Sequence, residues 1–313
     1  DGGSTNDYVV SAGDFNGDGK TDFITISKNG GGAWANGVRA DIVNAPFPDL
    51  LTSITNGLGS ATSFAYKPIT DSTVYTKGSG AAYPVHDVQM PVYVVSSHAT
   101  DNGIGGMTTT NYTYGQYRAD LNGRDLGFAW MEALNTANSI KTRTEMSQTW
   151  PYIGMTTYSK QSRNGTTLSE VTNTLANQSL GGTRYLPYVS QSVNKRYEVN
   201  GTWITTQTTS NVLDSYGNPT SVTVTMAYGT SIWTTLNTNT YVNDTTNWIL
   251  GKLTAATVKN TLPSGAYATR KTSFAYDAAG LLTQEVIEPD ITDKKLTTAY
   301  TYDVFGNRTG ATV

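Results

Sequence analysis

The chain has 313 residues and a formal net charge of −3, and 14% of its residues are charged. This balance, without any basic stripe, excludes the electrostatic pattern of a nucleic-acid-binding surface. There is no cysteine, which excludes disulfides and thiolate metal sites. No apolar run is long enough to cross a bilayer.

The composition favours an all-β protein of antiparallel strands and hairpins. There are 31 Gly and 20 Tyr, Thr and Val are frequent, and no long window shows helical periodicity. At this length the chain could bury one large core or form two or three domains. The first residues, Asp1-Gly2-Gly3-Ser4, are polar and do not form a signal peptide, so we expect the sequence to be a piece of a longer exported protein.

Near the N-terminus, residues 14–22 read Asp-Phe-Asn-Gly-Asp-Gly-Lys-Thr-Asp between two strand-like segments, 8–10 and 23–26. Oxygen-bearing side chains at the first, third, fifth and ninth positions can converge on a hard cation, and Gly19 permits a sharp bend. The predicted side-chain ligands are Asp14, Asn16, Asp18 and Asp22, and the predicted backbone ligand is the carbonyl of Lys20.

The flanking strands decide between two kinds of calcium loop. An EF-hand needs helical flanks and a Glu at position twelve, which is Thr25 here. The segment instead resembles an FG-GAP/VCBS repeat, which implies a β-propeller blade with a structural Ca²⁺. The alternative is an Asx- and Gly-rich hairpin turn that holds no ion.

The middle of the chain begins with a Pro-rich linker at 46–51 that leads into a strand. Asn56-Gly57 predicts a hairpin, after which Thr62, Phe64 and Tyr66 share one face of a strand. The run 50–59, with 64–68 and Tyr75-Thr76, resembles the middle region of the TcB subunits of insecticidal Tc toxins and of SpvB-like proteins.

Near the C-terminus, Tyr276-Asp277-Ala278-Ala279-Gly280 is echoed by Tyr302-Asp303-Val304-Phe305-Gly306. Alternation before each copy predicts a strand that ends in a turn, because Asp bonds nearby backbone N–H groups and Gly supplies positive φ. Looser copies lie at 213–219 and 120–128. We interpret these Tyr and Asp residues as structural.

The two copies resemble the RHS/YD-repeat family, which is written around Tyr-Asp-x-x-Gly-Asn/Arg. With the other resemblances they imply three parts. These are a propeller-blade segment (1–45), a Tc-toxin-like middle β region (46–150) and part of a coiled RHS/YD-repeat sheet (151–313).

The resemblance implies a function. RHS/YD repeats coil a continuous sheet into a hollow shell around a toxic C-terminal polypeptide, which is absent from this chain. The implied partners are the remaining shell, that cargo and a translocation subunit, and the implied location is secreted or on the bacterial cell surface. One predicted strand fits a wall, because Val222, Val224, Met226 and Tyr228 form one face and Ser, Thr and Ala form the other.

Enzyme chemistry has little support in the sequence. The two histidines, His86 and His98, lack a nucleophile motif, and the repeats carry no Asp-Pro-x-Gly-Leu self-cleavage motif. We therefore expect no enzyme activity. Two alternatives stay open. A surface adhesin or carbohydrate-binding protein could use Trp203, Trp233 or Trp248. A polysaccharide hydrolase would need a carboxylate pair, for which the candidates are scattered: Glu132, Glu145, Glu170 and Glu285.

Overall fold

The computed structural model describes residues 8–28, 37–45 and 49–313. All the regular elements of this part of the chain are strands, and all but one of their pairings are antiparallel, so the all-β prediction is confirmed. The chain divides into two compact units, residues 1–149 and 150–313. Part of the linker predicted at 46–51, residues 46–48, lies outside the described residues.

The first unit begins with a three-stranded sheet, β1-β2-β3. Strands β1 (Tyr8–Gly13) and β2 (Asp22–Ser27) pair on either side of the predicted cation loop, and β3 (Val38–Asp41) pairs with β2. The strands expected on both flanks of that loop are therefore present. Apolar side chains such as Val10, Phe23 and Val38 are exposed on this sheet.

The larger sheet of the first unit has the pairing order β4-β5-β8-β9-β12-β13. Its strands are β4 (Ser53–Thr55), β5 (Ala61–Pro68), β8 (Tyr93–Asp101), β9 (Met107–Gly115), β12 (Trp130–Asn135) and β13 (Ile140–Met146). The short strand β6 (Tyr75–Thr76) pairs with β9 in parallel. A small third sheet pairs β10 (Arg118–Asp120) with β7 (Val85–Asp87) and β11 (Asp125–Gly127).

The buried core of the described residues lies almost wholly in this unit. Ile69, Val74 and Tyr75 are at most 5% exposed, and Phe128 packs edge-on against Tyr75. The Tyr75 hydroxyl donates to the carbonyl of Val88 (2.7 Å) and accepts from a backbone N–H. Tyr75, which carried part of the resemblance, is thus a core residue.

The turn before β6 predicts a pH-dependent contribution to stability. The carboxylate of Asp71 accepts bonds from the hydroxyl and N–H of Thr73 and an ion pair from Lys67 (2.9 Å). These bonds, the Thr73 hydroxyl first, lower the pKa of Asp71 from 3.8 to about 2. Because the folded pKa is the lower one, the stabilisation is complete above the unfolded pKa and is lost as the pH falls towards 2.

We therefore expect Asp71→Asn to lower the urea midpoint at neutral pH and to differ little from the wild type near pH 2. Urea titrations of both proteins across this range provide the check. A difference that stays constant down to pH 2 would contradict the role given to Asp71.

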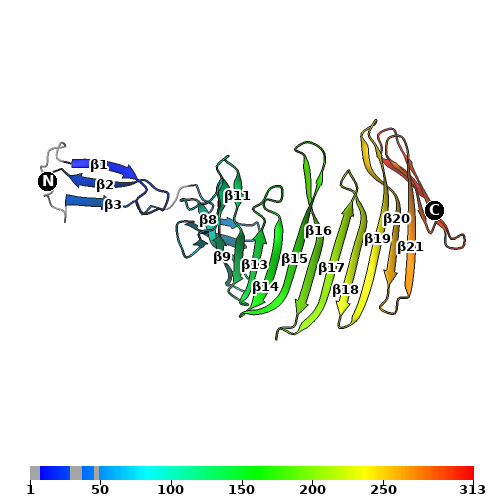
Figure 1. The fold of residues 1–313 in the computed structure, drawn as a ribbon, viewed down its shortest axis with the longest axis horizontal. Helices are drawn as coiled ribbons and strands as arrows, with labels where there is room; N and C mark the ends of the chain where they lie inside the picture. The colour runs from blue at the N-terminus through cyan, green and yellow to red at the C-terminus, as the bar shows by residue number, and fades with distance from the viewer. Residues whose placement is uncertain (1–7, 29–36, 46–48) are drawn as a thin grey trace. The chain divides into compact units, whose positions relative to one another are not determined.

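The second unit is one meander of eleven antiparallel strands, each paired with the next (Figure 1). They are β14 (Thr156–Arg163), β15 (Thr166–Ser179), β16 (Tyr185–Tyr197), β17 (Trp203–Leu213), β18 (Pro219–Tyr228), β19 (Ser231–Asp244), β20 (Ile249–Thr261), β21 (Tyr267–Tyr276), β22 (Leu282–Ile287), β23 (Leu296–Tyr302) and β24 (Arg308–Thr312). The strands predicted before both Tyr-Asp copies are confirmed as β21 and β23.

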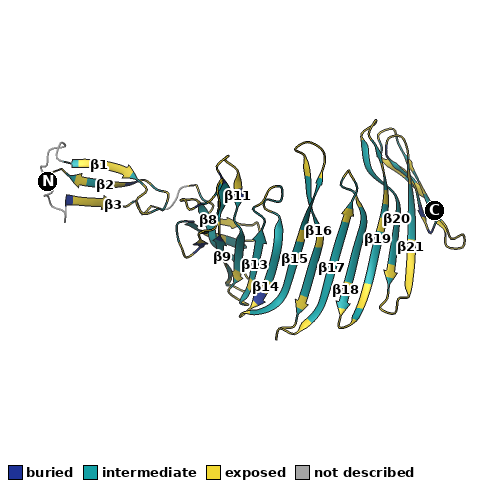
Figure 2. Ribbon diagram, in the orientation of Figure 1, coloured by how far each residue is buried: buried dark blue, intermediate teal, exposed yellow. Residues whose placement is uncertain are grey.

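This meander has no packed core. Along it only four residues are buried: Ser162, Gly280, Val286 and Glu288. Figure 2 shows half-buried and exposed residues along the labelled strands of this unit, apart from one buried position near the end of β14. Strands are half-buried by their pairing neighbours alone, so the meander is a single layer with solvent on both faces.

The hairpin predicted at Asn56-Gly57 is confirmed, since β4 and β5 pair antiparallel around it. Its loop runs over residues 56–60, with the Gly59 N–H bonded to the Asn56 carbonyl. Gly59, not Gly57, has positive φ (85°). The longer loop forms because the Asn56 side chain accepts the N–H groups of Leu58 and Ser60.

Candidate functional site

The predicted cation loop is closed by its own hydrogen bonds. The two carboxylate oxygens of Asp14 accept the N–H groups of Gly17, Asp18 and Gly19. The side-chain oxygen of Asn16 accepts the N–H of Asp18 (3.0 Å). This pattern is an Asx-type turn, which Asp and Asn form readily because their short side chains reach the backbone ahead of them.

The other two acidic side chains of the loop have different partners. Asp18 forms an ion pair with Lys20 (2.8 Å). Burial raises the pKa of Asp18, but the bonds from Lys20 and Asn16 outweigh it, and the net pKa is lowered. Asp22 is fully buried, and its two oxygens accept the N–H groups of Phe15 and Val43.

The donor types suit calcium, and in the structure their oxygens bond within the protein. In the described residues, no group of three His, Cys, Asp or Glu side chains could hold a metal. Lys20 places its ammonium where a cation would meet Asp18, and Asp22 holds β2 against the residues that follow β3. Calcium binding by Asp14, Asn16, Asp18, Lys20 and Asp22 remains a prediction.

That prediction has a direct check. If the loop binds calcium, EGTA will lower the thermal midpoint and added Ca²⁺ will restore it, because a ligand of the folded state stabilises that state. Lys20→Ala should strengthen the effect by releasing Asp18. A melting curve that EGTA leaves unchanged, with no heat of calcium binding by calorimetry, would contradict it.

Four Asp-x-x-Gly turns share one hydrogen-bond scheme. Their Asp residues are Asp120, Asp214, Asp277 and Asp303. In each turn one Asp oxygen accepts the N–H groups two and four residues ahead, and the Gly N–H bonds the Asp carbonyl. The glycines, Gly123, Gly217, Gly280 and Gly306, have φ between 80° and 87°. Gly adopts positive φ without a steric cost, so the Asp-x-x-Gly spacing is turn chemistry.

The residue after the glycine explains the Asn/Arg that ends the motif. Arg124, Asn218 and Asn307 each donate to the second oxygen of their Asp, at 2.8–2.9 Å. In the turn at Asp277 this position is Leu281, which has no side-chain donor. The loose copies at 120 and 214 are therefore full structural members of the set.

The tyrosines of the motif connect strands. The Tyr276 hydroxyl donates to the Leu253 carbonyl (2.9 Å), and the Tyr302 hydroxyl donates to the Leu282 carbonyl (2.8 Å). Burial raises the pKa of Tyr276, which keeps its proton in place for this bond. Both tyrosines therefore act as clamps within the sheet, as their structural interpretation predicted.

The turn scheme makes a quantitative prediction. Asp214→Ala removes three hydrogen-bond acceptances, from Tyr216 N–H and from the N–H and amide of Asn218. We expect a loss of about 1–2 kcal/mol in the free energy of unfolding, since hydrogen bonds to charged groups exceed neutral ones. Asp214→Asn, which keeps one acceptor oxygen, is the matched control and should lose less. Equal urea midpoints for all three proteins would contradict the scheme.

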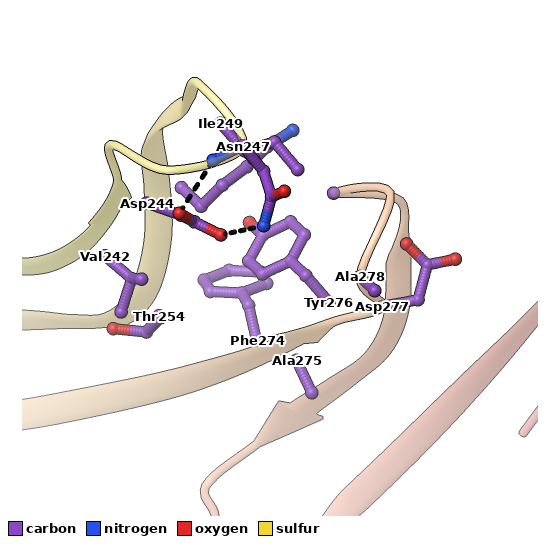
Figure 3. A pocket seen from close by; sticks show the side chains of 12 residues that line it. Val242, Asp244, Asn247, Ile249, Thr254, Phe274, Ala275, Tyr276, Asp277 and Ala278 are labelled. Atoms are coloured by element: carbon purple, nitrogen blue, oxygen red, sulfur yellow. Dashed lines mark hydrogen bonds between the residues drawn. The ribbon is translucent and has the colours of Figure 1, made fainter.

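A pocket lies between the turn joining β19 to β20 and the turn after β21 (Figure 3). Its volume is about 320 Å³, and Phe274 and Tyr276 line it. The Lys252 ammonium lies over the Tyr276 ring, 5.4 Å from its centre. Both oxygens of Asp244 accept bonds within its own turn: one from the N–H groups of Thr246 and Asn247, the other from the side-chain amide of Asn247. The pocket can take a small apolar group, but Asp244 is not free to act as an acid or base.

The residues considered for catalysis do not gather into a site. His98 lies against Tyr112 and shares a 3.0 Å hydrogen bond with its hydroxyl, and His86 is exposed on β7. The scattered carboxylates all have partners. Glu132 and Glu145 bond Arg143, Glu285 accepts the Tyr300 hydroxyl, and Glu170 accepts Tyr158, Lys195 and Tyr197.

The Glu170 cluster is a group that sequence reasoning missed. Its four members come from β14, β15 and β16, and the pairing of those strands brings them onto one face. The Tyr197 hydroxyl, Lys195 and Tyr158 lower the pKa of Glu170 against the cost of its burial. A carboxylate held ionised by three donors ties three strands together.

The tryptophans considered for sugar stacking also lie apart. Trp203 is the first residue of β17 and Trp233 the third residue of β19, whereas Trp248 lies in the turn at the far end of β19 and is 77% exposed. The Trp203 indole N–H donates to the hydroxyl of Thr206. They do not form one aromatic platform.

The fold and these sites define a class: an all-β protein whose Asp and Tyr motifs shape turns and join strands. The comparisons give the family. The model of the insecticide toxin TcdB middle/N-terminal region matches residues 2–160, just over half of the chain. The chain belongs to this family. No match was found among the curated proteins.

Solved structures share the fold. The crystal structure of TcdB2-TccC3 matches with a TM-score of 0.71 at 11% identity, and that of TcdB2-TccC3-Cdc42 with 0.72 at 11%. A TcdB2-TccC3 structure without the hypervariable C-terminal region gives 0.70 at 10%. Each alignment covers 97% of this chain and 23% of the other. The chain thus spans less than a quarter of those chains.

Proposed function

We propose that the chain is a structural, non-catalytic segment of a secreted toxin of the RHS/YD-repeat type. Its meander forms part of a hollow β-shell, and the shell encloses a toxic C-terminal polypeptide that lies outside this chain. Its partners are the rest of the shell, that polypeptide and a translocation subunit. No helix in the described part of the chain is long and apolar enough to span a membrane.

The observation that carries this proposal is the single layer of β14–β24. A sheet usually buries one face against another layer, because that burial supplies most of its stability. Here eleven strands have solvent on both faces, and Val286 is the one buried hydrophobic residue of the unit. A wall between an interior and an exterior has this construction.

The face of β18 that carries Val224 and Met226 suits a wall. Val224 on β18 pairs with Thr209 and Thr235, and Met226 pairs with Gln207 and Trp233. The apolar stripe predicted on β18 is therefore largely bordered by polar side chains and does not continue as an apolar face. Such a face can border an enclosed polypeptide without collapsing onto it.

The hairpins supply the stiffness that a single layer needs. Register shifts occur beside the turns at Asp214, Asp277 and Asp303. An extra residue of this kind increases the right-handed twist of a strand pair, and repeated twist coils a sheet. Tyrosine clamps and turn carboxylates then hold each hairpin in place.

The comparisons support the partner class. The matched structures are named as TcdB2-TccC3 complexes, and this chain shares their fold across nearly all its length. We extend to this chain the role of a component that acts together with a toxic polypeptide.

Limited proteolysis of the assembled toxin that contains this chain tests the proposal. The enclosed polypeptide should resist protease until the urea concentration is high enough to unfold the sheet. Circular dichroism measures that unfolding. Cleavage at the rate of the isolated polypeptide, with the sheet intact, would contradict enclosure. A glycan screen is the complementary check, because specific micromolar binding would favour the adhesin alternative.

A further inference from the structure

Three turns at one edge of the second unit surround a depression. Residues 180–184 join β15 to β16, residues 214–218 join β17 to β18, and residues 245–248 join β19 to β20. Figure 1 shows these turns along the upper edge of the meander. The depression has a volume of about 510 Å³, and six residues line it: Ser179, Leu180, Arg184, Ser215, Tyr216 and Trp248. It therefore combines two aromatic rings with one guanidinium.

Trp248 has a backbone conformation that does not suit a tryptophan. Its φ is 56°, in the left-handed region, where a side chain costs free energy and glycine does not. The two neighbouring turns place glycines in this region: Gly181, Gly182 and Gly217. The Trp248 side chain is 77% exposed, and its indole N–H has no acceptor in the described part of the chain. Neither packing nor hydrogen bonding accounts for this residue, and strain of this kind is typical of ligand sites.

Arg184 is held in place with part of its guanidinium free. Its Nε and Nη2 donate to the backbone carbonyls of Gly181 and Leu180, in its own turn. The guanidinium has five N–H groups, so its Nη1 and the second N–H of Nη2 are available. Arg184 forms no ion pair with any residue that the structure describes. A planar guanidinium with adjacent free N–H groups suits a carboxylate.

The acidic residues of these turns do not neutralise Arg184 by contact. Asp214 and Asp244 each accept bonds from backbone N–H groups and from an asparagine amide of their own turn. Neither carboxylate lines the depression. The positive charge of Arg184 is therefore left for a ligand.

The lining favours one class of ligand. An aromatic ring such as that of Trp248 or Tyr216 can pack against the C–H face of a sugar ring, and an indole N–H can donate to a sugar hydroxyl. A nucleic acid is disfavoured by the net charge of −3. A specific protein interface needs roughly 1,200 Å² of buried surface, which a depression lined by six residues does not supply.

We propose that this depression binds an acidic sugar, a pyranose ring that carries a carboxylate. Trp248 and Tyr216 contact the faces of the ring, and Arg184 pairs with the carboxylate. One ring of about fourteen non-hydrogen atoms binds with a Kd of about 1 mM. This affinity is weaker than the micromolar binding expected of an adhesin, and the inference does not depend on the shell.

Nuclear magnetic resonance titration of the whole chain with methyl β-glucuronide tests the proposal. Methyl β-glucoside, which has the same ring without the carboxylate, should bind about fivefold more weakly or less tightly still, because it lacks the charge-assisted pair. Trp248→Gly should weaken glucuronide binding about tenfold, the size of ring stacking on an aromatic side chain. Arg184→Gln should bind the two sugars alike. Trp203→Ala, which removes a tryptophan from the opposite edge of the sheet, is the control and should bind like the wild type.

Stability separates a binding role from a structural one. Trp248→Gly should keep or raise the urea midpoint, because glycine releases the strain of the left-handed conformation. A variant that is as stable as the wild type and binds less is therefore the expected result. A lower midpoint would show that Trp248 serves folding and would overturn the proposal. So would a wild type that binds neither sugar, equal binding of both sugars, or a Trp248→Gly variant that binds glucuronide as well as the wild type.

Discussion

Ile69→Ala should destabilise the first unit by about 2–5 kcal/mol, whereas Ile232→Ala in the meander should cost less than about 1 kcal/mol. Ile69 is 1% exposed and packs with Val74 and Tyr75, so its truncation leaves a cavity. Ile232 is 53% exposed on a sheet with no second layer, so little burial is lost.

Amide hydrogen exchange measured by mass spectrometry can read the two units separately. Faster exchange in β5, β6 and β9 of the Ile69 variant, with an almost unchanged pattern in the Ile232 variant, is the expected result. A loss of several kcal/mol from Ile232→Ala would show that the meander buries this face against another layer.

Gly115→Ala should cost about 1–3 kcal/mol through overpacking. Gly115 lies opposite Trp130 on the neighbouring strand, and a Cβ there would lie 2.0 Å from Cε2 of the indole. The indole cannot shift freely, because the Arg143 guanidinium lies 4.5 Å from its centre. In the alanine variant the Cβ must therefore displace the Trp130 ring, which the Arg143 guanidinium covers on one face.

Gly57→Ala is the control for this substitution. Its Cβ meets nothing within 4 Å, and Gly57 does not have positive φ, so we expect its urea midpoint to match the wild type. Tryptophan fluorescence should shift in the Gly115 variant alone. Identical midpoints for the two variants would mean that Trp130 does not cover Gly115 in solution.

Local chemistry was predictable from the sequence. The strands before Tyr276 and Tyr302 follow from alternation, and their turns follow from Asp and Gly at fixed spacing. The hydrogen bonds of these turns join residues within five positions of each other, so the sequence alone was enough to predict the turns. The flanking strands of the loop at 14–22 were predictable for the same reason.

Features that depend on register were not predictable. The cluster around Glu170 needs residues 158, 195 and 197 on one face, and only the pairing of β14, β15 and β16 decides that. The role of Tyr75 in the core depends on contact with Phe128, far along the chain. The sequence pattern at 14–22 also could not show that both carboxylate oxygens of Asp22 accept hydrogen bonds from backbone N–H groups.

Cryo-electron microscopy of the assembled toxin that contains this chain tests the central claim most directly. The account predicts that residues 156–312 form one continuous layer of strands, with no second sheet packed on either face and the Tyr-Asp turns along its rim. A map in which another sheet covers β14–β24 to form a sandwich with a buried core would contradict it.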